Sequence, residues 1–284
     1  MNIKRSILIS GVATLLTALP AYSGAVRGLA AGGTTFAAND DGSVGPVALG
    51  FSVNFFGSSG STVFVNNNGN VTFISALSTF TPSGLSGITQ PIIAPFFADV
   101  DTRGAGSGLT TYATGTITDG LLGWAAFDAF AVSWPAVGYF SSQTNKLNTF
   151  ELILVNRADT GAGNFDIEFN YDVMQWETGG ASGGTNGLGG TSAAAGFSNG
   201  LSGGSDVTYQ LPGSLVNGAL IDGGGNALTT HALNSSTAGR YDFQVRNGVV
   251  NELPPVESVV PEPGTIGLFA AGLIGLFAAA RRRQ

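Results

Sequence analysis

Short segments of the chain alternate hydrophobic and polar residues with a period of two. In residues 164–172, Phe165, Ile167, Phe169 and Tyr171 alternate with polar side chains. This pattern is typical of a β-strand with one buried and one solvated face. Comparable runs rich in Val, Ile, Phe and Thr, each closed by Gly, Asn or Pro, predict strands at 50–56, 62–65, 70–74, 92–98, 109–114, 122–134, 149–156, 165–171, 194–197, 207–211 and 241–245.

Turn residues separate the predicted strands and indicate antiparallel pairing. The run NNNGN at 66–70 lies between two apolar runs, and Asn and Gly readily take the positive φ of a tight turn, so a hairpin is expected. A Gly-rich stretch at 179–190 has almost nothing to bury and predicts a long mobile surface loop. The expected fold class is all-β, a single antiparallel β-sandwich domain over residues 24–250.

The composition favours an exported β-protein and excludes several kinds of site. The 284 residues include no Cys and one His, which rules out thiolate zinc sites, iron–sulfur clusters, disulfides and Cys nucleophiles. Charged residues make up 10% of the chain and hydrophobic residues 43%, too apolar for a disordered tail and too weakly charged for a helical bundle.

The working part of the chain is strongly acidic. Residues 24–260 hold 6 basic and 17 acidic residues, a formal net charge of −11. Counterion release from phosphates needs Lys and Arg, so nucleic acid is not an expected partner. Metal cations and neutral polymers such as polysaccharide remain possible binding partners.

The first 23 residues have the three parts of a secretory signal peptide. A basic start precedes an apolar run at 7–19, and small residues occupy the positions before a signal-peptidase site. We expect cleavage between Ser23 and Gly24, with cleavage after Ala25 as the second choice. The apolar run is shorter than the ~20 residues of a membrane span, which favours a signal peptide over a permanent anchor.

The C-terminal end has a second tripartite arrangement. A stiff linker with adjacent prolines is expected at 251–259, followed by a tail at 260–284 with an apolar segment at 265–280. Arginines after the apolar segment resist translocation, so the precursor should halt in the inner membrane with a transmembrane helix at 265–280 and its domain outside. The charged and proline residues that flank the segment are Pro261, Glu262, Pro263, Arg281, Arg282 and Arg283.

This tail resembles the PEP-CTERM sorting signal, which occurs on exported proteins of Gram-negative bacteria that make extracellular polysaccharide. Pro261, Glu262 and Pro263 match the sorting motif, and the three arginines match the basic stop-transfer end. The resemblance implies that an exosortase, a membrane protease of the sorting type, recognises the motif and removes the tail. It implies a location at the cell surface or in the extracellular matrix after processing. An ordinary C-terminal anchor is the alternative.

Six segments of the central region carry a second resemblance: VNNNGNVTF (65–73), TFTP (79–82), IIAPFFADVDTR (92–103), NKLNTFEL (145–152), DTGAGNFDIEF (159–169) and QWETG (175–179). Together they resemble the nidogen-like (NIDO) extracellular domain, over residues 51–245. One departure is Phe97, where the family usually has Trp. Nidogen-like domains occur in basement-membrane and other adhesive extracellular proteins, so the resemblance implies a non-enzymatic role in cell–matrix adhesion.

Asp99 and Asp101 are the most suggestive acidic pair. Alternate positions at a strand end would place both carboxylates on one face, about 6–7 Å apart. Two such carboxylates can share a Ca²⁺ ion with nearby backbone or Asn oxygens, since hard cations prefer oxygen ligands. Alternatively, Arg103 on the same face pairs with both and fixes the exit of the strand.

Other chemistry-bearing residues have simpler structural interpretations. Asp166/Glu168 and Asp172/Glu177 could act as acid and base on a sugar, but a solvated sheet face explains their alternation with Phe and Tyr. The single His231 has no carboxylate nearby in the sequence. Three tryptophans could stack on sugar rings, although core packing is usual in apolar strands: Trp124, Trp134 and Trp176.

The sequence therefore predicts a non-enzymatic, exported adhesion protein of the cell surface or extracellular matrix. Its expected partners are an exosortase-type sorting protease, the inner membrane transiently, and extracellular polysaccharide or other matrix components. One alternative is a Ca²⁺-dependent, lectin-like carbohydrate-binding module. The other is a carbohydrate-active enzyme.

Overall fold

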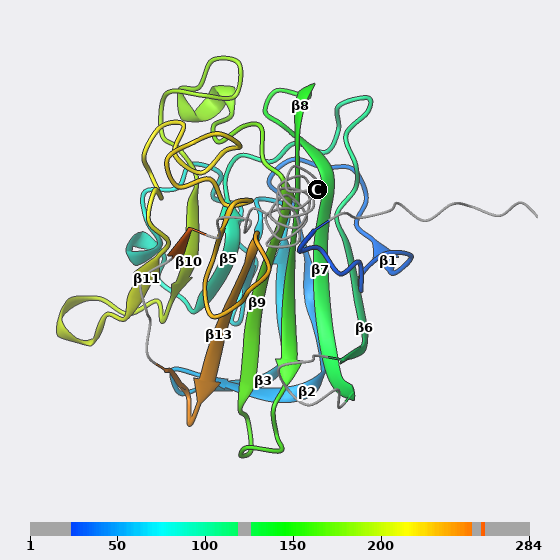
Figure 1. The fold of residues 1–284 in the computed structure, drawn as a ribbon, viewed down its shortest axis with the longest axis vertical. Helices are drawn as coiled ribbons and strands as arrows, with labels where there is room; N and C mark the ends of the chain where they lie inside the picture. The colour runs from blue at the N-terminus through cyan, green and yellow to red at the C-terminus, as the bar shows by residue number, and fades with distance from the viewer. Residues whose placement is uncertain (1–23, 119–125, 252–256, 259–284) are drawn as a thin grey trace, which may run out of the picture.

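The computed structural model describes residues 24–118, 126–251 and 257–258, and two antiparallel β-sheets packed face to face dominate this part of the chain (Figure 1). The first sheet has the order β1-β6-β7-β8-β9-β13-β14. Its strands are β1 (Thr34–Thr35), β6 (Thr111–Thr118), β7 (Ala126–Tyr139), β8 (Gln143–Asn156), β9 (Phe165–Val173), β13 (Arg240–Arg246) and β14 (Val249–Val250).

The second sheet has the order β11-β10-β5-β4-β3-β2. Its strands are β2 (Ser43–Phe55), β3 (Ser58–Asn66), β4 (Asn70–Thr72), β5 (Ile92–Phe97), β10 (Ala194–Ser198) and β11 (Thr208–Gln210). A separate two-stranded sheet pairs β12 (His231–Ala232) with β15 (Glu257–Ser258). Of these two strands, β15 lies within the expected linker. Short 3₁₀ helices are η1 (Leu85–Gly87), η3 (Gly180–Ser182) and η4 (Gly203–Ser205).

Each strand predicted from the sequence overlaps a strand of the structure, and the all-β sandwich is confirmed. The additional strands β1, β12, β14 and β15 have two residues each. So short a strand carries no period-two pattern, because two positions cannot show a repeat. These four short strands are recognised only by their backbone pairing with a neighbouring strand, which their own residues do not predict.

The apolar faces of the two sheets meet in one core. Phe165, Ile167 and Phe169 are fully buried, as their alternation predicts. Trp134 stacks on Phe150 with ring centroids 5.0 Å apart. Full burial of one large apolar side chain contributes about 1.5–3 kcal/mol, so this aromatic core is a major source of stability.

The β3–β4 hairpin confirms the predicted turn and ties the sheets together. Gly69 has φ of +71°, and a Cβ there would overlap the carbonyl oxygen of Phe96, so only glycine fits. The indole Nε1 of Trp134, on the first sheet, donates to the carbonyl of Asn67 in the turn at 3.0 Å. The turn is therefore fixed from both layers.

The polar face of β9 is covered, which corrects the expectation of a solvated face. Glu168 and Asn170 are buried because the segment that carries Arg27 lies across them. The Arg27 guanidinium donates to Glu168 through Nε at 2.6 Å and Nη2 at 2.7 Å. Its backbone nitrogen donates to Glu151 Oε2 at 2.9 Å. The first residues of the expected mature chain thus complete the fold.

The Gly-rich stretch is a hydrogen-bonded loop that packs against the core, so the expectation that it has almost nothing to bury is wrong. Gly184 donates to the carbonyl of Gly179, and Thr185 and Leu188 bond each other in both directions. A Cβ at Gly187 would lie 2.7 Å from Cβ of Trp176. Glycine is therefore required here for close approach to the core, which composition alone does not reveal.

No helix among the described residues is long and apolar enough to cross a membrane. The expected transmembrane helix at 265–280 lies outside those residues, as do the signal peptide at 1–23 and most of the linker and tail.

Candidate functional site

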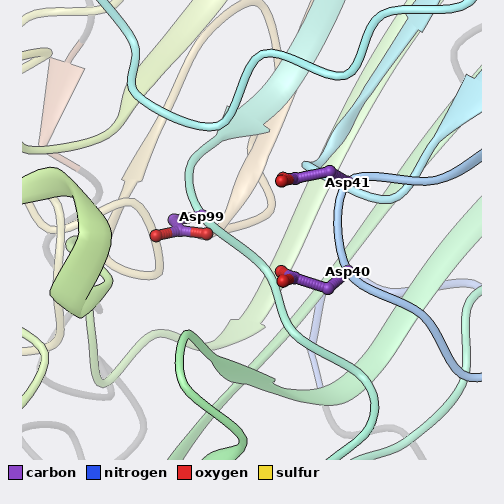
Figure 2. A group of neighbouring side chains, drawn as sticks. All are labelled: Asp40, Asp41 and Asp99. Carbon is purple, nitrogen blue, oxygen red and sulfur yellow. The ribbon is translucent and has the colours of Figure 1, made fainter.

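Three carboxylates from distant parts of the chain converge near the β7–β8 turn. Asp40 and Asp41 lie just before β2, and Asp99 follows β5. One carboxylate oxygen of each lies within 4.8 Å of those of the other two. Figure 2 shows the side chains of Asp40 and Asp41 pointing toward Asp99. We call Asp40, Asp41 and Asp99 the acidic cluster.

Backbone pairing and the β3–β4 turn bring the two segments together. Asp40 forms an isolated antiparallel bridge with Asp101. Asn68, in the turn, contacts both segments: its Nδ2 donates to Asp41 Oδ1 at 2.8 Å, and its Oδ1 accepts from the Val100 nitrogen at 2.9 Å. The Asn-rich turn therefore positions the acidic cluster.

Asp101 is held by Arg103 and does not belong to the acidic cluster. Arg103 donates from Nε to Oδ1 at 2.9 Å and from Nη2 to Oδ2 at 2.7 Å, and the Ser142 nitrogen donates to Oδ2 at 2.7 Å. Burial raises the pKa of Asp101, but these hydrogen bonds lower it by more, so the pKa lies below its ordinary value. Arg103 also reaches Asp40 Oδ2 at 2.8 Å, but no hydrogen bond joins it to Asp99 among the described residues.

Asp99 is buried, and no ion pair joins it to a basic side chain among the described residues. It is 1% exposed, and its Oδ2 is buried with no hydrogen-bond partner among the described residues. Burial raises its pKa to about 7, with further contributions from the negative charges of Asp40, Asp41 and Asp101. Burial, followed by Asp41, likewise raises the pKa of Asp40 to about 6. Such an arrangement is costly while the carboxylates are ionised and uncompensated.

The donor set of the acidic cluster consists of oxygen atoms. Carboxylates together with nearby carbonyl and amide oxygens suit a hard divalent cation such as Ca²⁺. The cluster contains neither of the softer ligands, imidazole and thiolate, that zinc sites usually contain.

A surface groove lies beside the acidic cluster. It has a volume of about 430 Å³ and lies between the β7–β8 turn and the Gly-rich loop. The backbone of Asp99 adjoins the groove: the Phe140 nitrogen donates to the Asp99 main-chain carbonyl at 3.2 Å, and Phe140 lines the groove. The lining combines aromatic, hydroxyl and amide groups: Tyr139, Phe140, Ser141, Gln143, Thr185 and Asn186, with Gly180 and Gly184. We call this the end groove.

The tryptophans do not provide a sugar-stacking surface where they are described. Trp134 and Trp176 are fully buried, and their Nε1 atoms donate to carbonyls of Asn67 and Val137 at 3.0 Å each. Trp124 lies outside the described residues. The prediction of core packing is therefore confirmed for these two side chains.

Each carboxylate pair considered for acid–base chemistry has a member that is held by structural partners, Asp166 in one pair and Glu177 in the other. Asp166 pairs with Arg157 at 2.8 Å and with Arg246 at 2.6 Å. Glu177 accepts from the backbone nitrogens of Gly218 and Leu220 at 2.6 Å each.

His231 lies in β12, and its Nδ1 is 3.0 Å from the carbonyl oxygen of Ala227.

The residues expected to direct export lie almost entirely outside the described part of the chain. This holds for Ser23, for Pro261, Glu262 and Pro263, and for Arg281, Arg282 and Arg283. Gly24, the expected first residue of the mature chain, is described and exposed.

Sequence reasoning did not identify Asp40 and Asp41. Their only local signal is the NDDG run at 39–42, which indicates a turn: Gly42 donates to Asn39 Oδ1 at 2.9 Å, and Asp41 has φ of +58°. Their proximity to Asp99 depends on the pairing of strands far apart in the sequence.

Similarity to known proteins covers most of the sandwich. The nidogen-like domain family model matches residues 61–247, and the PEP-CTERM protein-sorting motif matches residues 259–283. Alpha-tectorin of Homo sapiens is 38% identical in an alignment of 194 positions that covers 62% of this chain and 8% of alpha-tectorin. Alpha-tectorin of Gallus gallus is 35% identical in an alignment of 196 positions that covers 62% of this chain and 9% of that protein. The chain thus spans less than a tenth of these relatives' length. No solved structure matches it.

Proposed function

The chain belongs to the family of nidogen-like domain proteins, and from that premise we propose that it is a non-enzymatic adhesion protein of the cell surface or extracellular matrix. One observation carries the proposal: the nidogen-like match and the PEP-CTERM sorting motif occur in one chain, at 61–247 and 259–283. The first is a domain of adhesive extracellular proteins, and the second directs export in bacteria that make extracellular polysaccharide. An exported domain with these two properties is suited to hold cells or matrix polymers together.

We further propose that the end groove contacts extracellular polysaccharide. Glycan binding needs a partly apolar surface with a few hydroxyl and amide groups that can exchange hydrogen bonds with sugar hydroxyls. Phe140, Gln143, Thr185 and Asn186 provide that combination. The strongly acidic chain favours a neutral polymer over an anionic one.

The C-terminal tail, which matches the sorting motif, is the basis of a proposal for how the precursor is processed. We propose that the precursor halts in the inner membrane with its domain outside, that an exosortase-type protease cleaves near Pro261, Glu262 and Pro263, and that the mature domain reaches the surface or matrix of a Gram-negative bacterium. The signal peptide at 1–23, the domain at 24–250, the linker at 251–259 and the tail at 260–284 are the corresponding functional units.

Co-sedimentation of the exported protein with purified matrix polysaccharide tests the proposal. Wild-type protein should pellet with the polymer. Gly180→Leu should reduce pelleting, because a Cβ at Gly180 meets only Phe140 at 3.6 Å and a longer side chain would fill the end groove. Gly204→Leu is the matched control, since Gly204 also lies in an exposed 3₁₀ turn and a Cβ there contacts nothing within 4 Å. Wild-type protein that stays in solution would contradict polysaccharide adhesion.

A Ca²⁺-dependent, lectin-like function is the second candidate, and the acidic cluster beside the end groove favours it. Repeating the co-sedimentation with a chelator distinguishes cation-independent adhesion from the lectin-like function. Binding that survives the chelator supports cation-independent adhesion, and binding that is lost supports the lectin-like alternative. Turnover of a glycan by the same protein would instead indicate a carbohydrate-active enzyme.

A further inference from the structure

We propose that Asp40, Asp41 and Asp99 bind one Ca²⁺ ion, which joins the segment before β2 to the chain after β5. The proposal does not depend on the adhesion function. It starts from the acidic cluster, in which one oxygen of each carboxylate lies within 4.8 Å of the other two. Acidic groups often gather on surfaces without a ligand, so the geometry alone does not establish a site.

Asp99 supplies the independent observation. Its side chain is buried, its Oδ2 has no hydrogen-bond partner among the described residues, and one of its carboxylate oxygens is turned toward Asp40 and Asp41 (Figure 2). A buried carboxylate without a hydrogen bond or a counter-ion is strongly unfavourable, and native proteins rarely keep one. Asp40 Oδ1 is also buried and without a hydrogen-bond partner among the described residues. Both orphan groups belong to the same cluster, and one cation would compensate both.

Arg103 compensates only part of this negative charge. Its guanidinium is committed to Asp101 through Nε and Nη2, and it reaches the cluster only at Asp40 Oδ2. Asp40 Oδ1 and the Asp99 carboxylate oxygen that is turned toward Asp40 and Asp41 are therefore left for a ligand. Asp101, held on both oxygens, is not a ligand in this proposal.

The surroundings of Asp99 are shaped to keep its carboxylate in place. Gly179 packs against it so closely that a Cβ would overlap Asp99 Oδ2. Gly179 has φ of −80°, which any residue can adopt, so the need for glycine there comes from space and not from the backbone. Asn68 fixes Asp41 from the other side at 2.8 Å. Preorganised carboxylates of this kind lower the cost of ordering a site on binding.

Ca²⁺ is the hard cation that best suits three carboxylates from two loops. It accepts six to eight oxygen ligands with irregular geometry, whereas Mg²⁺ demands a near-ideal octahedron. Waters and nearby oxygens would complete the coordination. Extracellular Ca²⁺ modules bind with dissociation constants of about 10⁻⁴–10⁻³ M, which is the range expected here.

Thermal unfolding of the exported protein, treated with chelator and then titrated with CaCl₂ or MgCl₂, tests the site. Ca²⁺ at 10 mM should raise Tm by roughly 3–10 °C, because a ligand that binds only the folded state stabilises it by mass action. Mg²⁺ should raise Tm by less. Asp99→Asn should lose the Ca²⁺ shift while its Tm in chelator equals or exceeds that of wild type, since the buried charge is removed.

Asp128→Asn is the matched control, because Asp128 is exposed on β7, far in sequence from the cluster, and the substitution removes the same charge. It should keep the full Ca²⁺ shift. An unchanged wild-type Tm would overturn the site, as would an equal Ca²⁺ shift in Asp99→Asn. An equal response to Mg²⁺ would overturn the assignment to Ca²⁺. If Asp99→Asn fails to fold, Asp41→Asn provides the same comparison.

Discussion

Arg103 holds Asp101 in a two-point ion pair, with Nε 2.9 Å from Oδ1 and Nη2 2.7 Å from Oδ2. Two donors of one planar guanidinium on one carboxylate form a strong and directional contact. Asp101 is fully buried, so the pair fixes the loop that follows β5. It also leaves Asp99, two residues earlier, facing Asp40 and Asp41 without a direct ion pair of its own among the described residues.

Gly179→Ala should destabilise the protein by about 1–3 kcal/mol, because the added Cβ overlaps Asp99 Oδ2 and one of the two must move. It should also weaken the Ca²⁺ response of Tm, since displacement of Asp99 disturbs the proposed site. The neighbouring Gly180→Ala is the control: its Cβ meets the Phe140 carbonyl oxygen at an ordinary 3.6 Å. Chemical unfolding of both variants measures the difference, and equal stability of the two would disprove the steric argument.

Stability should fall as pH rises from about 4.5 to 7, partly because of Glu151. Burial raises the pKa of Glu151 to about 7, and the nearby charge of Glu168 adds to this, while the Arg27 backbone nitrogen opposes it. In this window the folded protein keeps a proton that the unfolded chain has lost, so raising the pH favours unfolding. Glu151→Gln should remove roughly 2–3 kcal/mol of that pH dependence. Unfolding curves at pH 5 and 7.5, with chelator throughout, measure it. Parallel pH profiles for wild type and variant would contradict the assignment.

The mature chain should begin at Gly24 and not at Val26. Ala25 is fully buried, and its carbonyl accepts from Arg240 Nη2 at 2.8 Å. Cleavage after Ala25 would remove that contact, whereas cleavage after Ser23 keeps it. A Cβ on Gly24 would lie 3.9 Å from Asp172 Oδ1, so the new amino group would have a carboxylate close by. N-terminal sequencing of the exported protein decides between the two, and a start at Val26 would refute the expectation.

Replacing Pro261, Glu262 and Pro263 by Ala should block processing without changing the hydrophobicity of the tail. A simple membrane anchor would tolerate the change, whereas a sorting signal would not, so the variant should accumulate as uncleaved precursor in the inner membrane. Mass spectrometry of the C-terminus in both strains measures this. Wild-type protein recovered from the matrix with Gln284 intact would argue against removal of the tail.

The sequence predicted the strands well because alternation records which side chains share a buried face, as Phe165 and Ile167 do in β9. It could not show what covers the other face. Glu168 and Asn170 look solvated in sequence, yet Arg27, more than a hundred residues earlier, lies over them. The acidic cluster has the same origin. Asp99 stood out by its spacing, but Asp40 and Asp41 join it only through the bridge from Asp40 to Asp101 and the bond from Asn68 to Asp41.

Retention of the processed protein in the matrix tests the adhesion proposal most directly. Three strains would produce wild type, Gly180→Leu or Gly204→Leu, and the mature protein would be quantified in the matrix and in the cell-free medium. The proposal predicts that wild type and Gly204→Leu stay in the matrix, while Gly180→Leu, equally processed and folded, is released into the medium. Mature wild-type protein found mainly in the medium would contradict the proposal.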